Sequence, residues 1–160
     1  MTHPLLVTVL ALSIGLSGTA VRAQERVPVR VEGFGGYAVF GDSGSGDHGT
    51  FGAKARWLAA SRIAVGPEFA YMIGPGRDRD LFLMGGLTVD LLRERRVTPY
   101  VSAAAGLMGH SDEGASWSEL ALVVGLGARI KVRERLFVGF ECREGKPLHV
   151  RLEAGVGYRF

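Results

Sequence analysis

The sequence has 160 residues, of which 24 are glycine and 47% are hydrophobic. This length is that of one domain, and the apolar content excludes a charged, disordered chain. Lys and Arg number 19 against 16 Asp and Glu, a near balance that argues against nucleic acid as a partner.

The first 23 residues differ from the rest. The start MTHP is followed by the apolar run LLVTVLALSIGLSGTA and by Val21-Arg22-Ala23, which has small residues at the two positions that a signal peptidase reads. This pattern predicts a signal peptide over residues 1–23. A retained anchor is the alternative, but the apolar run is shorter than the about 20 residues of a spanning helix. We therefore expect a mature chain of one domain, residues 24–160.

Segments with alternating or continuous apolar residues then recur along the chain, separated by clusters of Gly, Ser, Asp and Arg. No helical period persists for three turns, so we expect strands. Eight are predicted, over residues 27–40, 49–60, 62–73, 81–92, 99–109, 118–132, 136–144 and 148–160. The odd-numbered links between them are expected to face outward, and the even-numbered links are short and rich in Arg. Pro67 within the third segment predicts a local bulge, because proline cannot donate a backbone hydrogen bond.

Each segment has one face that is almost free of charge. In the sixth, Leu120, Leu122, Val124 and Leu126 alternate with smaller or polar residues. The other faces carry many glycines and the mid-strand charges, namely Arg30, Glu32, Lys54, Arg56, Glu68, Asp90, Arg129, Lys131, Glu141, Arg143, Arg151, Glu153 and Arg159. Only about one layer of side chains fits inside eight strands, so glycines and charged chains suit the interior and bulky aliphatic residues suit lipid.

The predicted fold is therefore all-β, an eight-stranded antiparallel up-and-down transmembrane β-barrel. Closure satisfies every backbone N–H and C=O group, which lipid cannot do. A secreted soluble barrel of the lipocalin type is an alternative. It requires a hydrophobic interior and a polar outer face, the reverse of the pattern found.

The chain resembles the small eight-stranded outer-membrane barrels of Gram-negative bacteria, a group that includes OmpA transmembrane domains and OmpX-like and OmpW-like proteins. The resemblance rests on the leader, the eight alternating segments and the final aromatic pair, Tyr158 and Phe160. It implies contact with outer-membrane lipid and recognition of Tyr158 and Phe160 by the barrel-insertion machinery. The outward loops are short for this group, which weakens an adhesin function.

The thirteen charges of the inner faces have two interpretations. They line a path for a small solute, or they neutralise one another and close the interior. We expect the second, because eight strands leave little room for an aqueous channel. The sequence thus predicts a monomeric, non-enzymatic barrel of the cell outer membrane, with a structural or surface-interaction role and no cofactor.

A lipid A-modifying enzyme is the remaining alternative, since some eight-stranded outer-membrane barrels are lipid A deacylases. His110-Ser111-Asp112 has the residue types of a hydrolase. Catalysis requires the base within hydrogen-bond reach of the nucleophile, which neighbouring loop residues rarely achieve. The H-x-S-N pattern of those deacylases is missing. We interpret the three residues as part of an outward loop.

No metal site is expected from the sequence. Acidic residues gather in the predicted outward loops without the spacing of a calcium loop, and we interpret them as solvated charge: Asp42, Asp47, Asp78, Asp80, Asp112 and Glu113. His48 and His149 lie near the outer rim with no partner at a recognised metal-ligand spacing.

Overall fold

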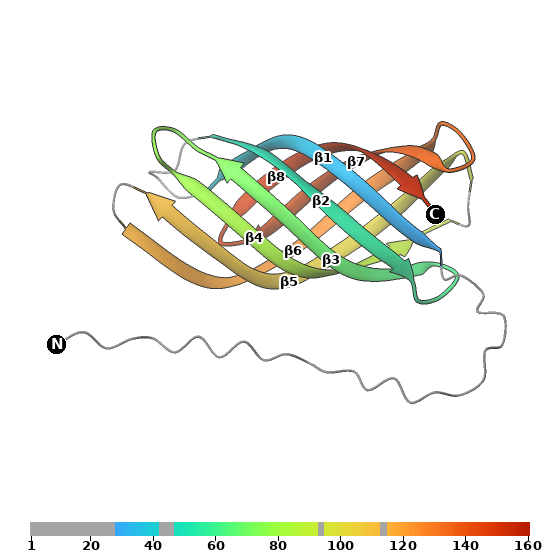
Figure 1. Ribbon diagram of the computed structural model, residues 1–160, viewed down its shortest axis with the longest axis horizontal. Coiled ribbons are helices and arrows are strands. Elements are labelled where there is room, and N and C mark those ends of the chain that lie inside the picture. Colours follow the sequence, from blue (N-terminus) through green and yellow to red (C-terminus); the bar gives the residue numbers. More distant parts are fainter. Residues whose placement is uncertain (1–27, 42–46, 93–94, 113–114) are drawn as a thin grey trace, which may run out of the picture.

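The computed structural model describes residues 28–41, 47–92, 95–112 and 115–160, which form a closed barrel of eight antiparallel strands (Figure 1). The strands are β1 Val29–Phe40, β2 His48–Leu58, β3 Ile63–Ile73, β4 Arg79–Asp90, β5 Val97–Asp112, β6 Ala115–Lys131, β7 Leu136–Lys146 and β8 His149–Arg159. Each strand pairs with the next and β8 pairs with β1. The predicted fold class is confirmed. The predicted signal peptide, residues 1–23, lies outside the described residues.

No helix in the described ranges is long and apolar enough to cross a bilayer.

The barrel has two ends that differ in what they hold. The terminal end carries the start of β1, the end of β8 and the turns β2–β3, β4–β5 and β6–β7. The far end carries the links β1–β2, β3–β4, β5–β6 and β7–β8, on the left of Figure 1. At the far end β5 and β6 extend beyond their predicted bounds, and pairing continues as far as Asp112 and Ala115. Apolar alternation fades there while backbone pairing does not, so the sequence pattern underestimates these strands.

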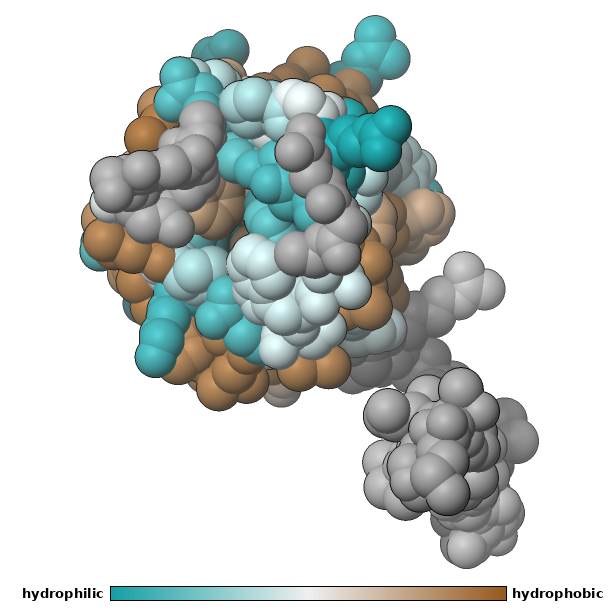
Figure 2. Space-filling model, turned by 90° about the vertical axis from the view of Figure 1, so that its left-hand side faces the viewer, coloured by the Kyte–Doolittle hydropathy of each residue, from teal (hydrophilic) through white to brown (hydrophobic). Residues whose placement is uncertain are grey.

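The outer face is apolar, as the parity of the sequence predicts. Leu122, Leu126 and Val150 are 47%, 65% and 44% exposed, whereas Ala121 and Val123, on either side of Leu122, are buried. Figure 2, which looks onto the far end, shows a hydrophilic centre surrounded by hydrophobic side chains. This arrangement is the reverse of the one that a lipocalin-type barrel requires.

The interior contains an apolar cluster as well as charges. Phe34, Met72, Phe82, Met84 and Met108 are buried in contact with one another and with smaller residues. Aromatic rings and flexible thioethers fill the irregular space that alternating large and small side chains leave in a narrow barrel. The barrel is therefore packed with side chains along much of its length.

Pro67 marks an irregularity between β2 and β3. Lys54 pairs with Glu68 and Trp57 pairs with Val65, but the two residues between them on each strand are unpaired. Because the gap has the same length on both strands, the predicted bulge is wrong: the ladder is interrupted without an extra residue. Arg56 compensates, since its Nη1 donates to the carbonyl oxygens of Gly66 (3.0 Å) and Pro67 (2.8 Å).

Replacing Gly66 by Ala is expected to lower the free energy of unfolding by about 1–3 kcal/mol, the usual cost of a strained backbone conformation. Gly66 has φ +156°, and a Cβ there would overlap the carbonyl oxygen of Ala55 and lie 2.7 Å from a ring carbon of Trp57. Urea unfolding in vesicles measures the loss. The control is Gly85→Ala, since a Cβ at Gly85 meets nothing within 4 Å. Equal effects of the two substitutions would contradict the assignment of strain to Gly66.

Candidate functional site: the polar interior of the barrel

A network of buried ion pairs crosses the middle of the barrel. It joins inward-facing side chains of β2, β3, β7 and β8, which closure of the sheet brings together although they are up to 99 residues apart. Every member is buried, and the members are Lys54, Arg56, Glu68, Glu141, Arg143, Arg151 and Glu153. The structure thus assembles more than half of the thirteen predicted interior charges into one contact network.

Glu68 has the largest number of oppositely charged neighbours in this network, and Lys54 joins two of its carboxylates. Glu68 accepts a hydrogen bond from Arg143 and another from Arg56 at 2.7 Å, and Arg151 lies 3.8 Å away. Lys54 lies between two carboxylates, donating to Glu141 at 2.5 Å and to Glu153 at 2.8 Å. The side chains of Arg143 and Arg151 are 1% and 0% exposed. Such charges depend on their partners, because water does not reach them.

Neutral groups and glycines complete the packing around the network. Tyr100 and Ser102 on β5 both donate to Glu141. The carboxylate of Glu32 lies against Gly139 on β7 and Gly155 on β8. A Cβ added at either glycine would come within 2.8 or 2.7 Å, respectively, of Oε1 of Glu32. These glycines leave room for a long acidic side chain beside the sheet. A cavity of about 20 Å³ remains next to the network, which is enough for about one water molecule.

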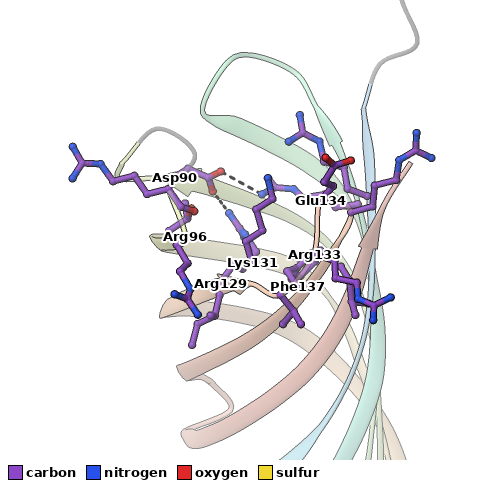
Figure 3. A pocket seen from close by; sticks show the side chains of 15 residues that line it. Asp90, Arg96, Arg129, Lys131, Arg133, Glu134 and Phe137 are labelled. Atoms are coloured by element: carbon purple, nitrogen blue, oxygen red, sulfur yellow. Dashed lines mark hydrogen bonds and ion pairs between the residues drawn. The ribbon is translucent and has the colours of Figure 1, made fainter.

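The terminal end of the barrel opens into a strongly basic cavity of about 650 Å³, shown in Figure 3. Asp90 binds Arg129 and also Arg30, the latter at 3.3 Å, so this carboxylate is shared by two guanidinium groups. The other charged lining residues come from strand ends and turns, and they are Arg95, Arg96, Lys131, Arg133, Glu134, Arg135 and Arg159. Eight basic groups against two acidic ones make this cavity, the basic basin, suited to anionic groups.

The predicted interior charges therefore do not form one network. Arg30, Asp90 and Arg129 form a separate cluster in the basic basin. Lys131 and Arg159 also line the basin, and Lys131 is exposed because β6 ends there. Residues of equal parity share a face, but a charge near a strand end cannot reach the middle of the barrel.

At the far end, four ionisable residues that the sequence did not connect lie close together in the interior. Nε2 of His48 lies 2.9 Å from Asp78 and 3.5 Å from Asp80. Nδ1 of His110 lies 2.7 Å from Asp80 and 3.5 Å from Asp78. The interpretation of Asp80 as solvated loop charge is wrong, since its side chain is 2% exposed. The sequence offered one signal that could have linked them. All four occupy inward-facing positions near the same end of the barrel.

The hydrolase interpretation is not supported by the positions of its three residues. His110, Ser111 and Asp112 lie at the end of β5 and not in a loop, which corrects the prediction. Successive residues of a strand point to opposite faces. His110 contacts Asp80 while Ser111 and Asp112 are exposed, so this sequence trio does not place a base beside a nucleophile.

The C-terminal aromatic residues lie on the outer face. Tyr158 and Phe160 are both exposed, with ring centroids 4.9 Å apart in an edge-on arrangement. They border the terminal end of the barrel, next to β1. An amphipathic ring at such a position suits the boundary between lipid and water.

Comparisons with known proteins identify the fold. No family model matches the chain, and no curated protein matches its sequence. Among solved structures, Neisserial surface protein A has a TM-score of 0.70 at 16% identity, covering 83% of this chain and 96% of that one. The N-terminal β-barrel domain of Pseudomonas aeruginosa OprF has 0.63 at 14% identity, covering 84% and 98%. The attachment invasion locus protein Ail of Yersinia pestis has 0.52 at 17% identity, covering 83% and 97%. The fold is that of eight-stranded outer-membrane β-barrels.

Proposed function

We propose that this chain is an integral protein of the cell outer membrane, a monomeric and non-enzymatic barrel whose interior is closed by its own charges. In this proposal the leader of residues 1–23 is cleaved on export. The barrel-insertion machinery then recognises Tyr158 and Phe160. The protein has a structural or surface-interaction role and needs no cofactor.

The observation that carries the proposal is the contrast between the two faces of the sheet. An aqueous environment would oppose an outer surface on which so many large aliphatic and aromatic side chains are exposed, since soluble monomers rarely carry so continuous an apolar surface. Lipid accepts that surface, and the closed sheet leaves no strand edge unpaired.

The closed interior supports a structural role over a small-solute channel. The buried ion pairs and the apolar cluster occupy the cross-section, and the cavity beside the ion pairs has room for about one water molecule. A charged solute would have to separate several buried pairs to pass. A lipid-modifying enzyme is less favoured, because His110 contacts Asp80 and not Ser111.

Cell fractionation and bilayer recordings test the proposal together. We expect the protein to sediment with outer membranes, to resist extraction by alkaline carbonate, and to migrate faster on gels before heating than after it. We expect no steady conductance when the purified barrel is inserted in planar bilayers. Release into the aqueous fraction without detergent would refute the membrane location. Reproducible single-channel steps would refute the closed interior and favour the channel.

A further inference from the structure

Two imidazoles and two carboxylates converge inside the far end of the barrel, and they form the metal-ligand cluster: His48, Asp78, Asp80 and His110. Ligand atoms of the first three lie within 4.8 Å of one another. His110 approaches the same two carboxylates from β5, at 2.7 and 3.5 Å. We propose that this cluster binds one divalent transition-metal ion of the zinc class.

The spacing of the ligand atoms suits a small tetrahedral ion. Bonds of about 2.0–2.1 Å, as zinc makes to imidazole nitrogen and carboxylate oxygen, place neighbouring ligand atoms about 3.3 Å apart in a tetrahedron. Nε2 of His48 lies 2.9 Å from Oδ2 of Asp78 and 3.5 Å from Oδ2 of Asp80, separations close to that value. Nδ1 of His110 lies 2.7 and 3.5 Å from the other oxygens, Oδ1 of Asp80 and Oδ1 of Asp78. His48, Asp78 and Asp80 therefore supply ligand atoms for one ion, and His110 supports the two carboxylates through their other oxygens.

The cluster is held in place by its surroundings. The turn that carries Asp78 is closed by backbone hydrogen bonds from Gly74 to Asp78 (3.0 Å) and from Asp78 to Pro75 (3.2 Å). Arg79 also clamps it, donating to the carbonyl oxygens of Asp78 (2.6 Å) and Gly74 (3.2 Å). A Cβ at Gly74 would overlap Nε2 of His48 and lie 2.8 Å from Asp78. Glycine thus allows the turn to approach the ligands.

Aromatic rings orient both histidines. The ring of Phe40 lies 4.7 Å from that of His48, and the ring of Trp117 lies 4.0 Å from that of His110, centroid to centroid. Such packing limits rotation of the imidazoles, which favours binding because less side-chain freedom is lost.

Charge and burial point to a cation. His48 and Asp80 are 1% and 2% exposed, so the two nearby carboxylates lie where negative charge is costly without compensation. Oδ1 of Asp78 is buried and accepts no hydrogen bond among the described residues. A bound divalent ion supplies the missing positive charge and an additional bond to these oxygens.

The donor set selects the class of metal. An imidazole nitrogen together with carboxylate oxygens suits Zn²⁺, Co²⁺, Ni²⁺ and Cu²⁺. Ca²⁺ and Mg²⁺ prefer shells made of oxygen alone, with six or more ligands for calcium. Tight binding of calcium here would therefore contradict the proposal.

Titration of the complete barrel tests the site. Tag-free protein is folded in detergent, stripped with a chelator and titrated with Co²⁺, followed by Zn²⁺ in competition. We expect one equivalent of Co²⁺ to bind with the intense visible absorption of a tetrahedral complex, and Zn²⁺ to abolish it. We also expect Zn²⁺, but not Mg²⁺, to raise the urea midpoint of unfolding. Failure of both ions to bind would overturn the proposal.

Variants place the ion in the cluster. Asp80→Asn and His110→Gln are each expected to weaken Zn²⁺ binding by more than about tenfold, at least the loss that follows removal of a supporting group. The matched control is Asp112→Asn, an exposed carboxylate on the same strand as His110, which should bind as the unaltered protein does. Gel migration before heating identifies the variants that fold. Unchanged affinity in folded Asp80→Asn and His110→Gln would overturn the assignment.

Discussion

Replacing Glu68 by Gln is expected to lower the free energy of unfolding by about 3–5 kcal/mol, the cost of removing one partner from a buried ion pair. Glu68 is the shared partner of Arg56, Arg143 and Arg151. Glutamine keeps the shape of the side chain but not its charge, so the guanidinium groups lose their common counter-ion in a site that water does not reach. Urea unfolding of the barrel in phospholipid vesicles measures the difference.

Two further variants distinguish lost charge balance from lost packing. Glu134→Gln removes an exposed carboxylate in the β6–β7 turn, at the terminal end, and should change stability by less than about 0.5 kcal/mol. Adding Arg143→Met to Glu68→Gln removes one stranded charge and should recover part of the loss. A loss below about 1 kcal/mol for Glu68→Gln would place this network among solvent-exposed pairs and contradict a closed interior.

An arginine in place of Leu83 is expected to destabilise the barrel by about 2–4 kcal/mol in a bilayer, the cost of that side chain near the membrane midplane. Leu83 is near the middle of β4 and is 56% exposed on the outer face. Leu148 is 61% exposed but lies in the β7–β8 link at the far end. The same substitution there should cost about 0–1 kcal/mol, because the charge reaches the interface.

Leu83 and Leu148 are almost equally exposed. A difference between Leu83→Arg and Leu148→Arg therefore reports the depth of each position in the bilayer and not its exposure. Unfolding in vesicles of both variants gives the two values. If both substitutions cost less than about 1 kcal/mol, the outer face meets water and the membrane location is wrong.

The interior has three polar zones, and each has a different proposed role. The middle network of Lys54, Glu68 and their partners closes the barrel and contributes to its cohesion. The basic basin at the terminal end has an excess of Arg and Lys that suits anionic groups. The metal-ligand cluster lies at the far end.

The sequence by itself determined the strands, their number and the face on which each side chain lies. Alternation along β8 placed Leu152 outside and Arg151 inside, and the structure has them so. This information is local, because the side chains of a strand alternate with a period of two. The extent of β5 and β6 was missed because backbone pairing continues where apolar alternation stops.

Only the tertiary structure decided which inward residues meet. Glu68 contacts Arg143, 75 positions away, while Asp90 serves the separate cluster at the terminal end. His48 and Asp80 are buried together although the sequence suggested a rim histidine and a solvated loop acid. These contacts depend on strand register and on the pairing of β8 with β1. Both are non-local, so the periodic pattern of residues along a single strand does not reveal them.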